Sequence, residues 1–159
     1  MLGGRRKPTQ PMGERLRVDY QQLQQFVSSS PWKVEPGRRV LVRKALQAIG
    51  PDVWVVDDTG FRKDGDSSPG VARQYSGTLG KIENCQIAVS IHAATDAASC
   101  PLDWRLFIPK AWDDTAADTN EQAAATAARR AKVQIPDLHR HRHRTKWAMA
   151  LEMVGELAL

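Results

Sequence analysis

Two adjacent carboxylates, Asp57 and Asp58, close an apolar run at residues 53–56 and are followed by Thr59 and Gly60. Adjacent carboxylates repel each other unless a cation neutralises them, so the pair indicates metal binding. Because side chains alternate along a strand, we expect Asp57 and Asp58 on opposite faces, with only one of them holding the metal. The alternative is a turn, since all four residues suit one. These residues alone leave both interpretations open.

The chemistry of such an acid has two candidate forms. In one, an aspartate is a ligand in a phosphodiester site, where two Mg²⁺ ions about 3.5–4 Å apart hold the attacking and leaving oxygens. In the other, Asp57 is a nucleophile that forms an aspartyl-phosphate. That second chemistry calls for an aspartate two residues after the first or a lysine directly after it, whereas positions 58 and 59 hold Asp and Thr. The sequence therefore favours the phosphodiester site.

The elements that would position these acids are strands. We predict strands at residues 53–57, 85–94 and 102–109. Residues 73–81 would add a strand that leads into a turn, residues 118–133 a helix or a flexible insertion, and residues 147–159 an amphipathic helix. A carboxylate at the C-terminal tip of a central strand is where open α/β sheets place catalytic groups. The order of elements predicts an α/β fold for residues 51–159.

Residues 1–50 are predicted to form a separate helical region. Two short helices within residues 12–28 are separated at residues 17–19, where Asp19 is placed as an N-cap, a pattern typical of a helix-turn-helix. Residues 36–49 predict an amphipathic helix. Its inward side chains are predicted to be Val40, Leu41, Ala45, Leu46 and Ile49. Its outward side chains are predicted to be Arg38, Arg39, Arg43 and Lys44.

The charge of the chain favours a polyanionic partner such as DNA, because 159 residues carry a net charge of +5 with a pI near 9.5. The candidate DNA contacts are Gln21, Gln25, Arg39, Arg43, Arg73 and Lys81. Gln pairs bidentately with adenine in the major groove, and Arg and Lys contact phosphates. Each of these side chains also has an ordinary interpretation as part of a solvated surface, which the sequence leaves open.

Cysteine and hydropathy patterns favour the cytoplasm. Cys85 and Cys100 form no Cys-x-x-Cys pair, and the first residues lack the apolar segment of a signal peptide. No run approaches the ~18–20 apolar residues of a membrane span. We therefore expect a reduced, cytoplasmic protein with neither a membrane nor a small molecule as its partner.

A long, irregular motif in this sequence resembles that of a known protein family. The run "WVVDDTGFRKDGDSSPGVARQYSGTLGKIENCQIAVSIHAA" and the later "PLDWRLFIPKAW" resemble the DDE-superfamily transposases of bacterial insertion sequences. They are most similar to the group whose first acidic motif reads Asp-Asp-Thr-Gly-Phe. The upstream "RRKPTQPMGERLRVDYQQLQQFVSSSPW" is similar to the helical region that precedes the catalytic core in that group. The resemblance covers nearly the whole chain.

The resemblance implies an RNase H-like core, a mixed sheet with helices, whose Asp, Asp and Glu carboxylates use Mg²⁺ to cleave DNA and join strands. It implies that Asp58 is the catalytic first acid and a metal ligand, with Asp57 ranked second as a ligand. The second Asp is expected after the helix at residues 147–159, and the Glu further on. The other acids of this chain do not match those motifs.

The chain is therefore expected to be an internal fragment that holds the first half of the core, at residues 51–159, and to be inactive alone. Two alternatives remain beside a transposase fragment. One is a non-catalytic DNA-binding module, and the other is an inhibitor of transposition that pairs with intact transposase or with itself.

Overall fold

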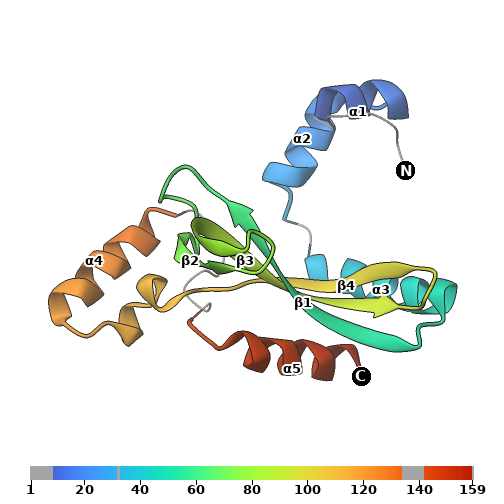
Figure 1. Cartoon of the computed structure of the whole chain (residues 1–159). Helices are drawn as coiled ribbons and strands as arrows, with labels where there is room; N and C mark the ends of the chain where they lie inside the picture. Colours follow the sequence, from blue (N-terminus) through green and yellow to red (C-terminus); the bar gives the residue numbers. More distant parts are fainter. Residues whose placement is uncertain (1–8, 32, 134–141, 159) are drawn as a thin grey trace. The chain divides into compact units, whose positions relative to one another are not determined.

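The computed structural model describes residues 9–31, 33–133 and 142–158 (Figure 1). The chain divides into two compact units, Met1–Gly37 and Arg38–Leu159. This division falls earlier than the boundary after residue 50 that the sequence predicts. The assignment of DNA binding to one region and catalysis to the other stays a prediction.

The first unit contains the two predicted short helices, α1 (Thr9–Leu16) and α2 (Tyr20–Ser28). Asp19 is the N-cap of α2, as predicted, and its carboxylate accepts a hydrogen bond from a backbone N–H of the first turn. Gly13 allows the two helices to approach, because a Cβ there would lie 2.8 Å from the carbonyl oxygen of Val18. The pair of helices joined by a tight turn is thus confirmed.

The second unit is built on an antiparallel sheet of four strands, β1 (Val53–Arg62), β2 (Ala72–Ser76), β3 (Lys81–Ala94) and β4 (Ser99–Leu106). The long strand β3 is central. Strand β1 pairs with one edge of β3, and β2 and then β4 pair with the other edge. The sheet with its helices confirms the α/β class and is consistent with the first half of an RNase H-like domain.

Strand β1 is longer than predicted and carries both acids in its interior. It pairs with β3 without interruption from Val53 to Arg62, so the prediction of a strand end or turn at Asp57 and Asp58 is wrong. Gly60 permits the continuous strand, because a Cβ at this position would lie 2.0 Å from Oγ of Ser76. The glycine therefore serves strand packing rather than a turn.

Two helices cover one face of this sheet, α3 (Val34–Ile49) and α5 (Lys146–Leu157), and Figure 1 shows α5 running along the strands. The shared core is formed by Val42, Val89, Ile91, Ala93, Leu102, Met149, Ala150 and Met153. The predicted inward face of α3 was partly wrong. Val40 and Leu41 are 45% and 69% exposed, because Val42 is the residue that points into the core.

A third helix, α4 (Asn120–Ala131), confirms the helical alternative for residues 118–133. It follows two short 3₁₀ turns, η1 (Lys110–Trp112) and η2 (Asp114–Ala116). Here Trp112 is buried in a second, smaller core, and its Nε1 donates to the carbonyl of Val71 at 2.7 Å. This small core supports the chain between β4 and the approach to α5.

Candidate active site

Asp58 and Asp57 lie on opposite faces of the sheet, as predicted. In the β1–β3 register Asp58 stands opposite Val89, a residue of the core beneath α5. Asp57 stands opposite Ser90, is exposed, and accepts a hydrogen bond at Oδ1 from the backbone N–H of Asp58 at 2.8 Å. The carboxylate of Asp58 therefore faces the helices, and that of Asp57 faces away from them.

The carboxylate of Asp58 contacts the first residue of α5. Nζ of Lys146 lies 2.6 Å from Oδ2 of Asp58, and the two side chains are 35% and 30% exposed. The same Nζ lies 5.6 Å from the centroid of the Phe107 ring, within the range of a cation–π interaction. Both charges are thus partly shielded from water, so their attraction is stronger than at a fully exposed surface.

Helix geometry explains why Lys146 points at the sheet. Thr145 caps α5 by accepting a hydrogen bond from the backbone N–H of Ala148, which fixes the start of the helix. The buried residues Met149, Ala150 and Met153 follow Lys146 at helical spacings of three, four and seven. Lys146 therefore continues the buried face of α5 toward β1.

The segment before α5 is held by a buried carboxylate, Asp113. It accepts hydrogen bonds from the backbone N–H of His143 at 2.8 Å and from Oγ1 of Thr115 at 2.7 Å, and it also contacts Arg142. Burial raises the pKa of Asp113, but these hydrogen bonds outweigh it and lower the pKa to about 2. A carboxylate that stays ionised here anchors the chain as it enters α5.

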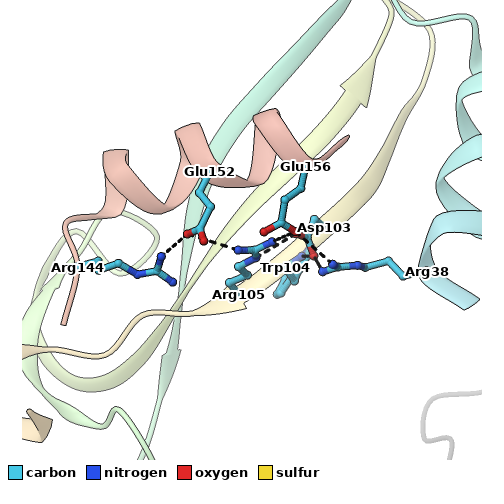
Figure 2. A network of polar contacts seen from close by, with 7 residues as sticks. All are labelled: Arg38, Asp103, Trp104, Arg105, Arg144, Glu152 and Glu156. Atoms are coloured by element: carbon cyan, nitrogen blue, oxygen red, sulfur yellow. Dashed lines mark hydrogen bonds and ion pairs between the residues drawn. The ribbon is translucent and has the colours of Figure 1, made fainter. Parts of the chain in front are cut away.

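A network of ion pairs fixes α5 over the sheet (Figure 2). At its centre is Asp103, whose side chain is 2% exposed and which pairs with Arg38 of α3 and Arg105 of β4. Arg105 in turn reaches Glu156 of α5 at 2.6 Å and Glu152 at 3.6 Å. The prediction that Arg38 lies outward is therefore wrong, because it neutralises a buried acid. The network joins three elements.

The sequence that carries this geometry matches a known family. The family model described as DDE superfamily endonuclease matches residues 1–159. The chain belongs to the DDE superfamily of endonucleases. It is also similar to a probable transposase for insertion sequence element IS701 of Microchaete diplosiphon, with 31% identity over 109 residues that cover 67% of this chain and 29% of that protein. The chain thus spans less than a third of this relative. No solved structure matches it.

Endonucleases of the DDE superfamily use divalent metal ions, but the described residues of this chain do not form such a site by themselves. No group of three or more His, Cys, Asp or Glu side chains gathers among them. Asp58 offers one carboxylate, and its neighbour Asp57 faces the other way. Divalent magnesium is held in proteins by one or two carboxylates together with further oxygens, such as those of phosphates and waters. The donor set seen here is therefore incomplete.

The predicted DNA contacts are not gathered around Asp58. Arg73 pairs with Asn84 and so lies, by strand alternation, on the face of Asp57. Lys81, which pairs with Glu83 at 2.9 Å, begins β3, roughly 26 Å along the strand from the residue opposite Asp58.

The remaining predicted contacts lie on helices. Gln21 and Gln25 are exposed one turn apart on α2, in the first unit. Arg39 and Arg43 are exposed one turn apart on α3, where Nε of Arg43 donates to the carbonyl of Arg39 at 3.4 Å. Their exposure suits contact with a partner, and DNA binding by these four side chains stays a prediction.

Among the helices that the structure describes, none has the length and apolar character of a membrane span.

Two residues of this arrangement, Lys146 and Asp103, are not among the candidate residues named from the sequence. Lys146 directly precedes the helix predicted at residues 147–159, and its spacing to Met149 and Met153 places it on the inward face of that helix. Asp103 is one of the acids that match neither of the missing catalytic motifs, and no local pattern reveals its position. Its partner Arg38 is distant in the sequence, so only the fold brings the two together.

Proposed function

We propose that this chain is part of an insertion-sequence transposase that cleaves DNA and joins strands, and that Asp58 is the first of its three catalytic carboxylates. The observation that carries the proposal is the position of Asp58 inside β1, partly exposed and on the helix-covered face, in a chain that matches a DDE endonuclease along its whole length. A partly exposed carboxylate is accessible to a ligand while its strand keeps it in place.

The proposed metal is Mg²⁺, with Asp58 as one oxygen ligand and the remaining ligands supplied from beyond the described residues. Magnesium suits this role because its hard oxygen coordination matches carboxylates and phosphates. Asp57 is a weaker candidate for the metal ligand than Asp58, because its side chain lies on the opposite face of the sheet. With one such carboxylate, the 159-residue chain alone is proposed not to cleave DNA.

The proposed partner is DNA, and the proposed compartment is the cytoplasm, a reducing environment that suits the free thiols of Cys85 and Cys100. Arg39 and Arg43, exposed on one side of α3, are the proposed phosphate contacts of the second unit. A gel-shift titration of duplex DNA at several salt concentrations tests them. Retardation should weaken steeply with salt, and Arg39→Gln with Arg43→Gln should reduce the slope by about two. Unchanged retardation would remove these two contacts from the proposal.

The catalytic assignment is tested in the transposase that contains this segment, with excision of its element from a donor plasmid as the readout. Asp58→Asn should reduce excision at least about a hundredfold, because a metal ligand contributes several kcal/mol to the reaction. Asp57→Asn is the matched control, since it makes the same chemical change on the opposite face. Excision that survives Asp58→Asn and fails in Asp57→Asn would transfer the role to Asp57.

A further inference from the structure

The negative charge of Asp58 is already balanced within this chain. Among the residues that the structure describes, the cation in contact with Asp58 is Lys146, with Nζ at 2.6 Å from Oδ2. That oxygen is one that a metal would use, and Mg²⁺ binds carboxylate oxygens at roughly 2.0–2.1 Å. An ammonium group and a divalent ion on one carboxylate oxygen repel each other, and the incomplete donor set cannot compensate for this.

We propose that Lys146 is a resident counter-cation of Asp58, which holds the carboxylate in place and competes with divalent metal for it. This inference rests on the proposed function, because it concerns the acid assigned there as a metal ligand. It follows from two observations: the described residues around Asp58 do not form a complete metal donor set, and Nζ of Lys146 contacts the carboxylate oxygen that a metal would need.

The contacts around α5 indicate that the Lys146 side chain, rather than the helix, would move to release Asp58. The approach to α5 is anchored by Asp113, and its later turns are held by the pairs of Glu152 and Glu156 with Arg105. The helix therefore stays in place, whereas the lysine stem is a flexible chain of four carbons. Release of Asp58 requires only rotation of the Lys146 side chain.

A purely structural ion pair is the competing explanation, and metal binding separates the two. If the pair only fastens α5 to β1, loss of the lysine charge lowers stability and leaves the affinity of Asp58 for metal unchanged. If Lys146 competes with metal, loss of its charge raises that affinity. Keeping the charge in Lys146→Arg should retain the wild-type behaviour.

The test is a Mn²⁺ titration of the ¹⁵N-labelled 159-residue chain, followed by paramagnetic broadening of the amides around Asp58 and Val89, which detects weak binding at a defined place. Lys146→Met should reach half-broadening at a Mn²⁺ concentration at least about fivefold lower than wild type, a ratio expected from removing one unit charge near the ion. Lys44→Met is the matched control, because it removes an exposed positive charge from α3. Lys146→Met combined with Asp58→Asn should abolish the local broadening.

Equal midpoints for wild type and Lys146→Met, or a higher midpoint for the variant, overturn the proposal. Lys146→Gln keeps a hydrogen-bond donor for Asp58 without the charge, and it replaces the methionine variant if that one is unfolded; its midpoint should fall likewise. The outcome is independent of catalysis. If Asp58→Asn abolishes excision but Lys146→Met leaves the Mn²⁺ midpoint unchanged, only the role of Lys146 as a counter-cation is contradicted. If excision survives Asp58→Asn, the proposed function is contradicted, and the Mn²⁺ result still decides the role of Lys146.

Discussion

The two faces of the sheet place the same kinds of residue in different surroundings. Beneath α3 and α5, Val89 and Ile91 of β3 are completely packed, and the acid Asp103 is enclosed by arginines. On the other face, Phe61 and Trp104 contact each other with ring centroids 5.8 Å apart and remain largely exposed. The large apolar side chains of β3 are therefore packed where α3 and α5 cover the sheet, although the small residues Ala88 and Ser90 of this central strand are buried on the other face as well.

The cover is uneven along the helix-bearing face itself. It is complete over Val89, Ile91 and Ala93 of β3, whereas Val56 of β1, which stands opposite Ile91, is 52% exposed. Asp58 is two residues further along the same strand face, at this boundary between packed and open surface. Its carboxylate is thus held by Lys146 yet accessible, a combination that neither Asp103 in the interior nor Asp57 on the open face offers.

The largest expected effect comes from truncating one β-branched side chain to alanine on each face. Ile91→Ala should lower the free energy of unfolding by about 3–4 kcal/mol, because a fully buried isoleucine leaves a cavity beneath α5. Val55→Ala on the exposed face should cost less than about 1 kcal/mol. Urea unfolding followed by circular dichroism measures both. Similar losses for the two variants would mean that the open face is packed in solution.

A smaller effect is expected when the same acid-to-amide change is made on each face. Asp103→Asn should cost about 2–3 kcal/mol, because hydrogen bonds from two arginines to a buried carboxylate lose their charged acceptor. Asp57→Asn, at an exposed position, should change stability by less than about 0.5 kcal/mol. The comparison uses the same urea titrations. If Asp103→Asn proved neutral, the network in Figure 2 would not fasten α5.

Local sequence patterns predicted which helices and strands form better than they predicted the residues at which these elements begin and end. Alternation and helical spacing identified the strands, the pair of short helices and the separation of Asp57 from Asp58, because each depends on neighbours in the chain. The turn at Gly60 was wrong because the glycine is required by Ser76, a contact made across the sheet. The inward face of α3 shifted for a similar reason, since Arg38 is drawn to a buried acid on β4.

The candidate site likewise contains one residue that the sequence identifies, Asp58, and one contact that only the fold reveals, the pairing with Lys146. Asp58 was accessible to sequence reasoning because its motif is contiguous, whereas the contact with Lys146 joins the first strand of the sheet to the last described helix. Helical spacing alone would have turned Lys146 inward, but it could not have named the residue that the lysine meets. That pairing joins residues 88 positions apart in the sequence, which no local pattern encodes.

The smallest expected effect is the loss of stability at low pH that follows protonation of Asp113, the carboxylate that anchors the approach to α5. The pKa of Asp113 is about 2 in the folded chain, below the ordinary value of 3.8, so its ionised form stabilises the fold at pH above about 4. This contribution, about 2 kcal/mol, should be lost as the pH falls from 4 to 2. Asp113→Asn, which cannot ionise, should lack this component of the pH dependence.

Urea titrations at pH 5, 4 and 3 measure this difference, with Asp113→Asn compared with wild type at each pH. The gap between the two proteins should narrow toward low pH, because protonation brings the wild type close to the amide variant. Amide hydrogen exchange adds the location: acid should accelerate exchange in α5, which follows the anchored segment, before it does so in α2 of the other unit. A difference in the free energy of unfolding that stays constant from pH 5 to 3 would show that Asp113 does not fix the approach to α5. The position of Lys146 over Asp58 would then depend on the ion-pair network alone.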